Sequence, residues 1–404
     1  EFEGAAACLD DERVSDATIQ ARFRAFDDQL VKLLLKCEQG AVRLAPVLES
    51  FSGYRLRLQE RSIGVLGRAR LAALSRSGEL VLMLTRRCQL RCTYCGIGEY
   101  GGTMTEATLR RAVDFLFASS RRDLRVQFFG GEPALEFRLI RKAVGWIEAL
   151  ARSSSKTVNM LITTNGLLLS AEMLEFFREH DILVDLSWDG ERGTQLSHRR
   201  SVSGRDYFPK LLKNTDALLA SGVRYQITMV VPPESVEKMF SNVKFLVGRG
   251  HRRVQINYAG ACFWPRGKSA ELLRQVELIC AAAPGWPGFE LLNATELRWE
   301  PALVNSSIVV DYDGTIFRDM GFYQKKDPAV AIGPIGETER IDELGLTPFE
   351  TFWRLSRIYS MENSSYMMKL LINNIVVGQL FGLACCGFTR RASRRERAVE
   401  NLAK

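Results

Sequence analysis

The sequence predicts an α/β fold in which six parallel strands curl into a full or partial barrel. From residue 79 onward, short β-rich runs alternate with amphipathic helical stretches. The predicted strands are 80–85, 124–129, 157–163, 182–187, 224–231 and 253–257. The predicted helices between them are 106–117, 135–151, 171–179, 208–220 and 236–247. Strands that alternate with helices pair in parallel through right-handed crossovers, and the active site of such a barrel lies at the C-terminal ends of its strands.

Both flanks of this alternating region have a different pattern. Residues 1–76 carry apolar positions at helical spacing, which predicts a helical N-terminal extension. Residues 266–404 contain a turn-rich piece at 311–314 and helical patterns near 349–359 and 366–378. We therefore expect three parts, with boundaries at 1–76, 77–265 and 266–404, the last being a smaller α+β domain.

Composition narrows the class of protein. Hydrophobic residues make up 46% and charged residues 25% of the 404 residues, as is usual for a globular protein. The nine cysteines are odd in number and scattered outside one cluster, so we expect reduced thiols and a cytoplasmic location, without a signal peptide. No apolar run reaches the roughly 18 residues that a membrane span needs, so no membrane association is expected.

The net charge is +8, and part of it lies in an arginine-rich tail at 390–397. Such a run is usually a solvated terminus, although it can also dock an acidic partner such as a peptide. No aromatic-plus-basic motif accompanies the charge, so we do not expect a nucleic-acid partner.

Three cysteines follow the first predicted strand in the pattern C-x3-C-x2-C: Cys88, Cys92 and Cys95, with Tyr94 before the third. Three thiolates on one loop can each bind a different iron of a cubane, which leaves the fourth iron open to the amino and carboxylate groups of S-adenosylmethionine (SAM). The alternative is a zinc site or three incidental cysteines. Zinc usually takes two ligand pairs, and no second pair lies at a matching distance in the sequence.

This loop resembles the signature of the radical SAM superfamily, and the resemblance extends over about residues 79–260. Three further motifs follow in the order of that family: Gly130-Gly131-Glu132-Pro133, Thr163-Thr164-Asn165-Gly166 and Ser187-Trp188-Asp189-Gly190. The resemblance implies a partial (β/α)6 barrel of the radical SAM type. It also implies SAM as a cofactor and one [4Fe–4S] cluster, with the three cysteines of the loop as its ligands.

The resemblance also implies which residues bind SAM. It places Gly130, Gly131 and Glu132 at the methionyl amino group, where a carboxylate would accept a charge-assisted hydrogen bond. It places Asn165 and Ser187 at the SAM ribose or carboxylate. Arg199 or Arg200 is expected to pair with the SAM carboxylate. Each of these residues is also compatible with a structural turn.

The order of the motifs most resembles the peptide-modifying branch with a SPASM or twitch extension, which includes sulfatase maturases and ribosomal-peptide maturases. The stretches 313–319 and 332–335 look like the cluster-binding passage of that extension. Arg318 stands where the passage has a cysteine, and the other cysteines of this half are Cys262, Cys280, Cys385 and Cys386. Because the last two are adjacent, they are poorly placed for two corners of a cubane, so we expect no auxiliary cluster. Asp319 occupies the position of the proposed base in sulfatase maturases, or is a surface turn residue.

The resemblance therefore implies an enzyme that reductively cleaves SAM to a 5′-deoxyadenosyl radical. The radical would abstract hydrogen from a ribosomally made peptide or a protein side chain. Electrons would come from an external donor such as flavodoxin or ferredoxin. The missing auxiliary cluster favours epimerisation, rearrangement or coupling over oxidations that pass an electron to a second cluster. The alternatives are a radical SAM enzyme acting on a small metabolite and, more distantly, a non-enzymatic iron–sulfur or zinc protein.

Overall fold

The computed structural model describes residues 78–97, 101–260, 262–295, 307–317, 331–337 and 341–344, with further helical positions between 370 and 385. The predicted extension at 1–76, the predicted helix at 349–359 and the arginine-rich tail lie outside the described residues. Among the helices that are described, none is both long and apolar enough to cross a bilayer.

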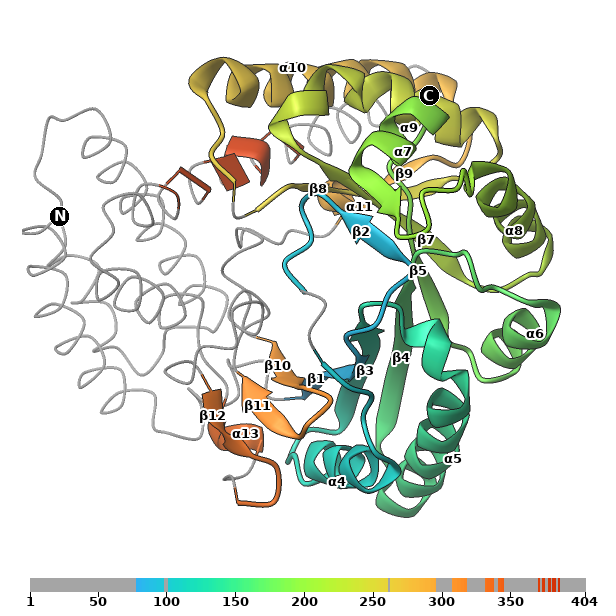
Figure 1. The fold of residues 1–404 in the computed structure, drawn as a ribbon, viewed down its shortest axis with the longest axis vertical. Helices are drawn as coiled ribbons and strands as arrows, with labels where there is room; N and C mark the ends of the chain where they lie inside the picture. The colour runs from blue at the N-terminus through green and yellow to red at the C-terminus, as the bar shows by residue number, and fades with distance from the viewer. Residues whose placement is uncertain are drawn as a thin grey trace, which may run out of the picture.

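A ten-stranded sheet forms the centre of the described part, in the order β12-β11-β10-β1-β3-β4-β5-β7-β8-β9. Its six central strands are parallel neighbours, and each corresponds to a predicted strand. They are β1 (Glu79–Thr85), β3 (Asp123–Gly130), β4 (Thr157–Thr164), β5 (Leu183–Ser187), β7 (Tyr225–Val231) and β8 (Arg253–Tyr258). The sheet of parallel strands curves round in Figure 1, which confirms the predicted α/β partial barrel.

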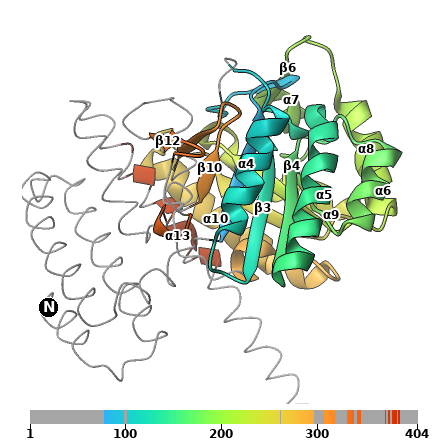
Figure 2. The ribbon, with the colours of Figure 1, turned by 90° about the horizontal axis from the view of Figure 1, so that it is seen from below.

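Helices cover the outer face of this sheet (Figures 1 and 2). The longer ones are α4 (Glu106–Phe117), α5 (Phe137–Ser154), α6 (Ala171–Glu179), α8 (Phe208–Ala220), α9 (Met239–Gly248) and α10 (Arg266–Ala282). Shorter turns of helix lie between them: η2 (Pro133–Glu136), α7 (Arg192–His198), η3 (Pro233–Lys238), η4 (Ala283–Gly285), α11 (Leu292–Thr295) and α13 (Ile341–Leu344). The first five long helices match the predicted ones. The 3₁₀ turns η2 and η3 precede two of the predicted helices, and each turn begins with a proline, which suits the first position of a helix.

Alternation along the strands separates an apolar layer under the helices from a polar barrel interior. Leu124, Val126 and Phe128 of β3 belong to the hydrophobic core, whereas Gln127 between them donates a hydrogen bond of 2.9 Å to Thr163 on β4. Thr163 in turn donates to Asp185 on β5 at 3.0 Å. The interior of the barrel therefore carries a polar belt across neighbouring strands.

Residues after 266 extend both edges of the same sheet (Figure 1). At one edge, β9 (Glu290–Leu291) pairs in parallel with β8. At the other, β10 (Ile308–Val310) pairs in parallel with β1, and β11 (Thr315–Phe317) and β12 (Ala331–Pro334) follow as antiparallel strands. The division of the chain at 266 stays a prediction, and the described strands beyond it are continuous with the barrel.

Candidate active site

The cysteine loop leaves the C-terminal end of β1 and is held by a small second sheet. In this sheet, β2 (Leu90–Cys92) pairs antiparallel with β6 (Arg199–Ser201), so that Cys92 lies opposite Arg199. The Thr93 amide donates to the His198 carbonyl at 2.8 Å, and the Cys95 amide closes a turn onto the Cys92 carbonyl at 3.0 Å. Backbone bonds thus fix the loop at the mouth of the barrel, where β6 and α7 lie in Figure 2.

The three thiols of the loop are free and differ in exposure, Cys95 being exposed and the other two half-buried. The Cys88 Sγ accepts hydrogen bonds from the Leu90 amide (3.3 Å) and from Asn165 Nδ2 (3.7 Å). Burial, assisted by the negative charges of Glu132, Cys92 and Cys95 and opposed by the hydrogen bond from the Leu90 amide, raises the pKa of Cys88 to about 12. Burial also raises the pKa of Cys92 to about 11, against the opposing effect of the Arg199 guanidinium. The sulfur atoms therefore act on one another electrostatically, and N–H donors lie at Cys88 and Cys92.

This donor set fits a [4Fe–4S] cluster better than a single metal ion. Across the described residues, no group of three or more His, Cys, Asp or Glu side chains is arranged to hold one metal ion. Thiolates that bind separate corners of a cubane do not need to converge on one ion. Soft thiolate ligands with hydrogen bonds to sulfur are the usual environment of iron–sulfur clusters.

The two glycines of the Gly-Gly-Glu-Pro motif pack against the backbone that precedes Cys88. A Cβ on Gly130 would lie 2.3 Å from the Thr85 carbonyl oxygen, and one on Gly131 would lie 2.4 Å from that of Arg87. In addition, the Gly131 amide donates to the Thr85 carbonyl at 2.8 Å. Their predicted contact with SAM stays a prediction, and the structure gives another reason for glycine here, which is close approach of two backbone segments.

Glu132 is fully buried and links two motifs. One carboxylate oxygen accepts from the Ala134 amide (3.0 Å) and the Thr164 hydroxyl (2.7 Å), and the other accepts from the Asn165 amide (2.8 Å). Burial raises the pKa of the Glu132 carboxyl, although these three hydrogen bonds oppose the shift. The role at the SAM ammonium group stays a prediction. In the contacts observed, the carboxylate ties the end of β3 to the end of β4.

Asn165 continues this link to the cysteine loop. Its Nδ2 donates to Cys88 Sγ, and its Oδ1 accepts from Gln89 Nε2 at 3.1 Å and from the Leu167 amide at 3.0 Å. Its predicted contact with SAM stays a prediction. The link through Gln89 was not expected, because nothing in the sequence singles out a glutamine between two cysteines.

Ser187 and Arg199 have different surroundings. Ser187 is the last residue of β5, half-buried at the mouth of the barrel, as the prediction of a SAM contact requires. Arg199 is buried, and its Nε and Nη2 donate to the two carboxylate oxygens of Asp189 at 3.0 and 2.9 Å. Arg200, the alternative, is exposed and donates to the Ser197 carbonyl.

The Arg199–Asp189 pair also includes Tyr94 of the cysteine loop. The Tyr94 hydroxyl donates to Asp189, and the Arg199 guanidinium lies 5.5 Å from the centre of the Tyr94 ring. Arg199 is thus engaged by Asp189 and Tyr94, which supports the cysteine loop, and its predicted pairing with the SAM carboxylate stays a prediction. The Ser-x-Asp-Gly element contains both Ser187 and Asp189, and nothing in its pattern indicates that Asp189 binds Arg199 and Tyr94.

Three predicted features cannot be located. Asp319, Arg318 and Cys386 lie outside the described residues. The predicted role of Asp319 as a base and the predicted absence of an auxiliary cluster both stay predictions.

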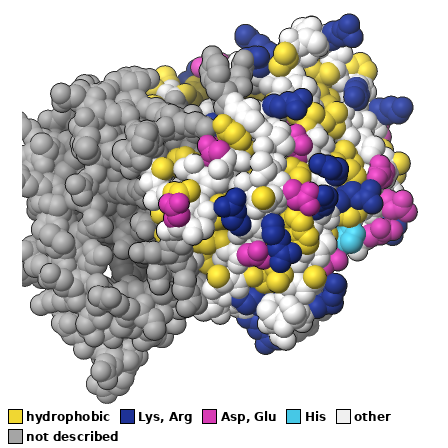
Figure 3. All heavy atoms as spheres, turned by 60° about the horizontal axis from the view of Figure 1, so that its bottom comes forward, with side chains coloured by type: hydrophobic (Ala, Val, Ile, Leu, Met, Phe, Trp, Pro, Cys, Tyr) yellow, Lys and Arg dark blue, Asp and Glu magenta, His cyan; other side chains and the backbone are white. Residues whose placement is uncertain are grey.

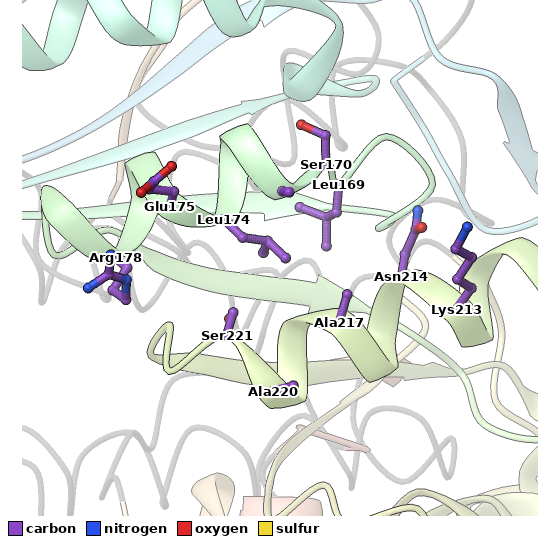
Figure 4. A pocket seen from close by; sticks show the side chains of 11 residues that line it. Leu169, Ser170, Leu174, Glu175, Arg178, Lys213, Asn214, Ala217, Ala220 and Ser221 are labelled. Atoms are coloured by element: carbon purple, nitrogen blue, oxygen red, sulfur yellow. The ribbon is translucent and has the colours of Figure 1, made fainter.

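A groove of about 580 Å³ lies elsewhere, on the outer face between α6 and α8 (Figure 4). Leu169, Leu174 and Ala217 line it together with the charged side chains of Glu175 and Lys213. None of the predicted site residues that the structure describes borders this groove. On the described part of the face in Figure 3, basic and acidic side chains are interspersed rather than gathered into one patch of either sign.

Comparisons with known proteins agree with this geometry. Residues 82–246 match the sequence model of the Radical SAM superfamily. The chain is 29% identical over 179 residues to an uncharacterized protein, MJ0907, of Methanocaldococcus jannaschii, covering 44% of this chain and 61% of that protein. It is 25% identical over 191 residues to a cysteine-type anaerobic sulfatase-maturating enzyme of Clostridium novyi, covering 44% of this chain and 49% of that enzyme. It is 31% identical over 166 residues to a GTP 3′,8-cyclase of Corynebacterium glutamicum, covering 38% of this chain and 42% of that enzyme. The matched regions thus span about half the length of these relatives.

A solved structure has the same fold over most of the chain. It is described as native anSMEcpe with bound AdoMet and Cp18Cys peptide. The TM-score is 0.61 at 17% identity, and the match covers 81% of this chain and 99% of that one.

Proposed function

Because the chain carries a radical SAM domain, whose cofactors are a [4Fe–4S] cluster and SAM, we propose that Cys88, Cys92 and Cys95 bind that cluster and that the protein cleaves SAM reductively. The observation that supports this most is the cysteine loop itself, which lies at the mouth of the barrel with two N–H donors at Cys88 Sγ. When bound, the cluster supplies one electron to the SAM sulfonium, and breaking the C5′–S bond gives methionine and a 5′-deoxyadenosyl radical.

The chain's own residues would hold these groups in place. Asn165 and the Leu90 amide donate to Cys88, which favours its thiolate form. The Arg199 cation offsets part of the negative charge at Cys92. Ser187 offers a half-buried hydroxyl at the end of β5 for the polar part of SAM. Gly130 and Gly131, with Glu132 behind them, would form the side of the site that receives the methionyl amino group.

We place the substrate among ribosomally made peptides or protein side chains. The similarity to a sulfatase-maturating enzyme supports this choice, since such an enzyme acts on a protein. The shared fold with a structure that contains a peptide is compatible with it. An external flavodoxin or ferredoxin would deliver the electron, and Asp319 would act as a base near the substrate. The similarity to a GTP 3′,8-cyclase supports a second candidate, a small-molecule substrate.

The first test is SAM cleavage by the anaerobically reconstituted protein with a chemical reductant. We expect methionine and 5′-deoxyadenosine, measured by mass spectrometry. Replacing Cys88, Cys92 and Cys95 together with Ala is expected to abolish both iron binding and cleavage. Cys262→Ala is the matched control, because this cysteine lies outside the loop and is expected to leave both unchanged. Cleavage by the triple variant would show that the cluster lies elsewhere.

The second test separates the two substrate classes. Peptides encoded beside the gene and GTP are offered separately to the reduced enzyme with SAM. A peptide substrate is expected to raise the rate of 5′-deoxyadenosine formation and to change in mass. Stimulation by GTP, with every peptide left unchanged, would decide for the small-molecule candidate.

A further inference from the structure

One arginine joins the cysteine loop to a strand connection more than two hundred positions later. Arg86 directly follows β1 and stands two residues before Cys88. Its Nε and Nη2 donate to the two carboxylate oxygens of Asp311 at 3.3 and 2.6 Å. Its Nη1 donates to the Ile97 carbonyl at 3.1 Å, just beyond Cys95. A single guanidinium therefore holds the entry of the loop, its exit and the C-terminal part of the chain.

Asp311 is itself fixed by the sheet. It lies in the turn between β10 and β11, and β10 pairs with β1 so that Val310 stands beside Leu82. The Asp311 amide donates to the Thr315 carbonyl at 2.9 Å, which closes the turn. The carboxylate thus comes from the turn that follows the strand next to β1, near the C-terminal end of β1.

The contact is buried and tightly packed. The side chains of Arg86 and Asp311 are 3% and 0% exposed. A Cβ on Gly101 would lie 2.6 Å from Arg86 Cδ and 2.8 Å from the Tyr312 ring. The segment that leaves the cysteine loop therefore passes directly over the arginine and the C-terminal turn. In such surroundings an ion pair keeps a defined geometry, and loss of one partner leaves an uncompensated buried charge.

We propose that Asp311 is a positioning residue for the cysteine loop, acting through Arg86, so that the β10–β11 hairpin is part of the cluster site. The proposal rests on the proposed function of the loop as the cluster ligand set. The C-terminal hairpin would then have a role that needs no auxiliary cluster. Through Arg86 it would fix both ends of the loop that carries the three thiols.

The test compares Asp311→Asn with Asp313→Asn in the full chain. Both aspartates lie in the same turn, and each accepts a bond from a nearby amide, but Asp313 is exposed. The first readout is amide hydrogen exchange without iron, which reports local opening. We expect Asp311→Asn to speed exchange at 86–97 by about 10-fold or more, and Asp313→Asn to leave it within about two-fold of wild type.

The second readout is iron release from the reconstituted protein to a chelator, together with the electron paramagnetic resonance spectrum of the reduced cluster with and without SAM. Asp311→Asn is expected to release iron about 10-fold faster and to alter the spectrum with SAM, because the thiols are held less firmly. Asp313→Asn is expected to match wild type.

A second pair of variants is used if Asp311→Asn does not fold. It consists of Arg86→Lys and its control, Arg87→Lys. A lysine keeps a charge beside Asp311 but cannot hold both carboxylate oxygens and Ile97, so exchange at 86–97 is expected to accelerate. Arg87 is exposed, so Arg87→Lys should have no effect. Unchanged exchange in the Arg86 or Asp311 variant would overturn the proposal, as would acceleration spread equally over α5 and the barrel strands. Exchange does not depend on SAM cleavage, so a failure of the proposed function would be seen separately, as wild-type protein that binds no iron.

Discussion

Replacement of Glu132 by Gln separates two roles of this carboxylate. The side chain is fully buried and accepts hydrogen bonds from Ala134, Thr164 and Asn165. Glutamine is almost the same size but offers only one acceptor oxygen. In either orientation of the amide, at least one backbone N–H of Ala134 or Asn165 faces an NH₂ group and loses its acceptor.

The expected loss of stability follows from these contacts. A buried N–H without an acceptor costs about 1–3 kcal/mol, and bonds to a neutral oxygen are weaker than bonds to a carboxylate. Removal of the charge offsets part of this loss of stability, because burial disfavours the ionised form of Glu132. We expect a net loss of about 2 kcal/mol in the free energy of unfolding. For a domain of this size, that corresponds to a decrease in Tm of about 4–8 °C.

The assay is urea unfolding of the variant beside Glu136→Gln. Glu136 is half-buried and accepts a single bond from Thr103 at 2.9 Å, which a glutamine oxygen can keep. The control is therefore expected to lie within about 0.5 kcal/mol of wild type. Wild-type stability for Glu132→Gln would refute the assignment of Glu132 as a tie between strands. SAM affinity is measured on the same variants. A decrease of about 10-fold or more with intact iron would support the role at the ammonium group.

Three further results are expected. Reconstituted protein should hold about four irons per chain, whereas about eight would reveal an auxiliary cluster despite Arg318. Burial raises the pKa of Asp185, so the folded state binds its proton more tightly than the unfolded state. The stability of wild type relative to Asp185→Asn should therefore fall as pH rises from the ordinary aspartate pKa of about 3.9 to the raised value, and then level off. Urea midpoints between about pH 3 and 7 would measure this, and a difference that rises with pH would contradict it. Finally, Asp319→Asn should keep iron and SAM binding but slow product formation by at least about 10²-fold, and a wild-type rate would make Asp319 a turn residue.

The barrel was predictable because its signal is periodic. Each central strand has enough residues to show alternation or a continuous apolar run, and β4 agrees with its predicted bounds to one residue. The polar belt follows from the same alternation, since Asp185 lies two residues before Ser187 and so on the same face of β5. The second sheet was missed because β2 and β6 have only three residues each, too few for any period.

Individual side-chain contacts around the cysteine loop were less predictable than the strands, and the two arginine–aspartate pairs show why. Arg199 lies opposite Cys92 through the pairing of β6 with β2, and its side chain donates to Asp189, which the sequence pattern did not indicate. Arg86 has no signal in the sequence, because its partner Asp311 becomes a neighbour only when β10 joins β1. Motif reasoning assigns polar residues near a reactive loop to the ligand. In the structure, Arg86 pairs with Asp311 at the start of the cysteine loop, and Arg199 pairs with Asp189 beside Cys92. Buried bidentate pairs of this kind fix orientation as well as charge, so the loop that carries the thiols is held from two sides by pairs that do not themselves require a ligand.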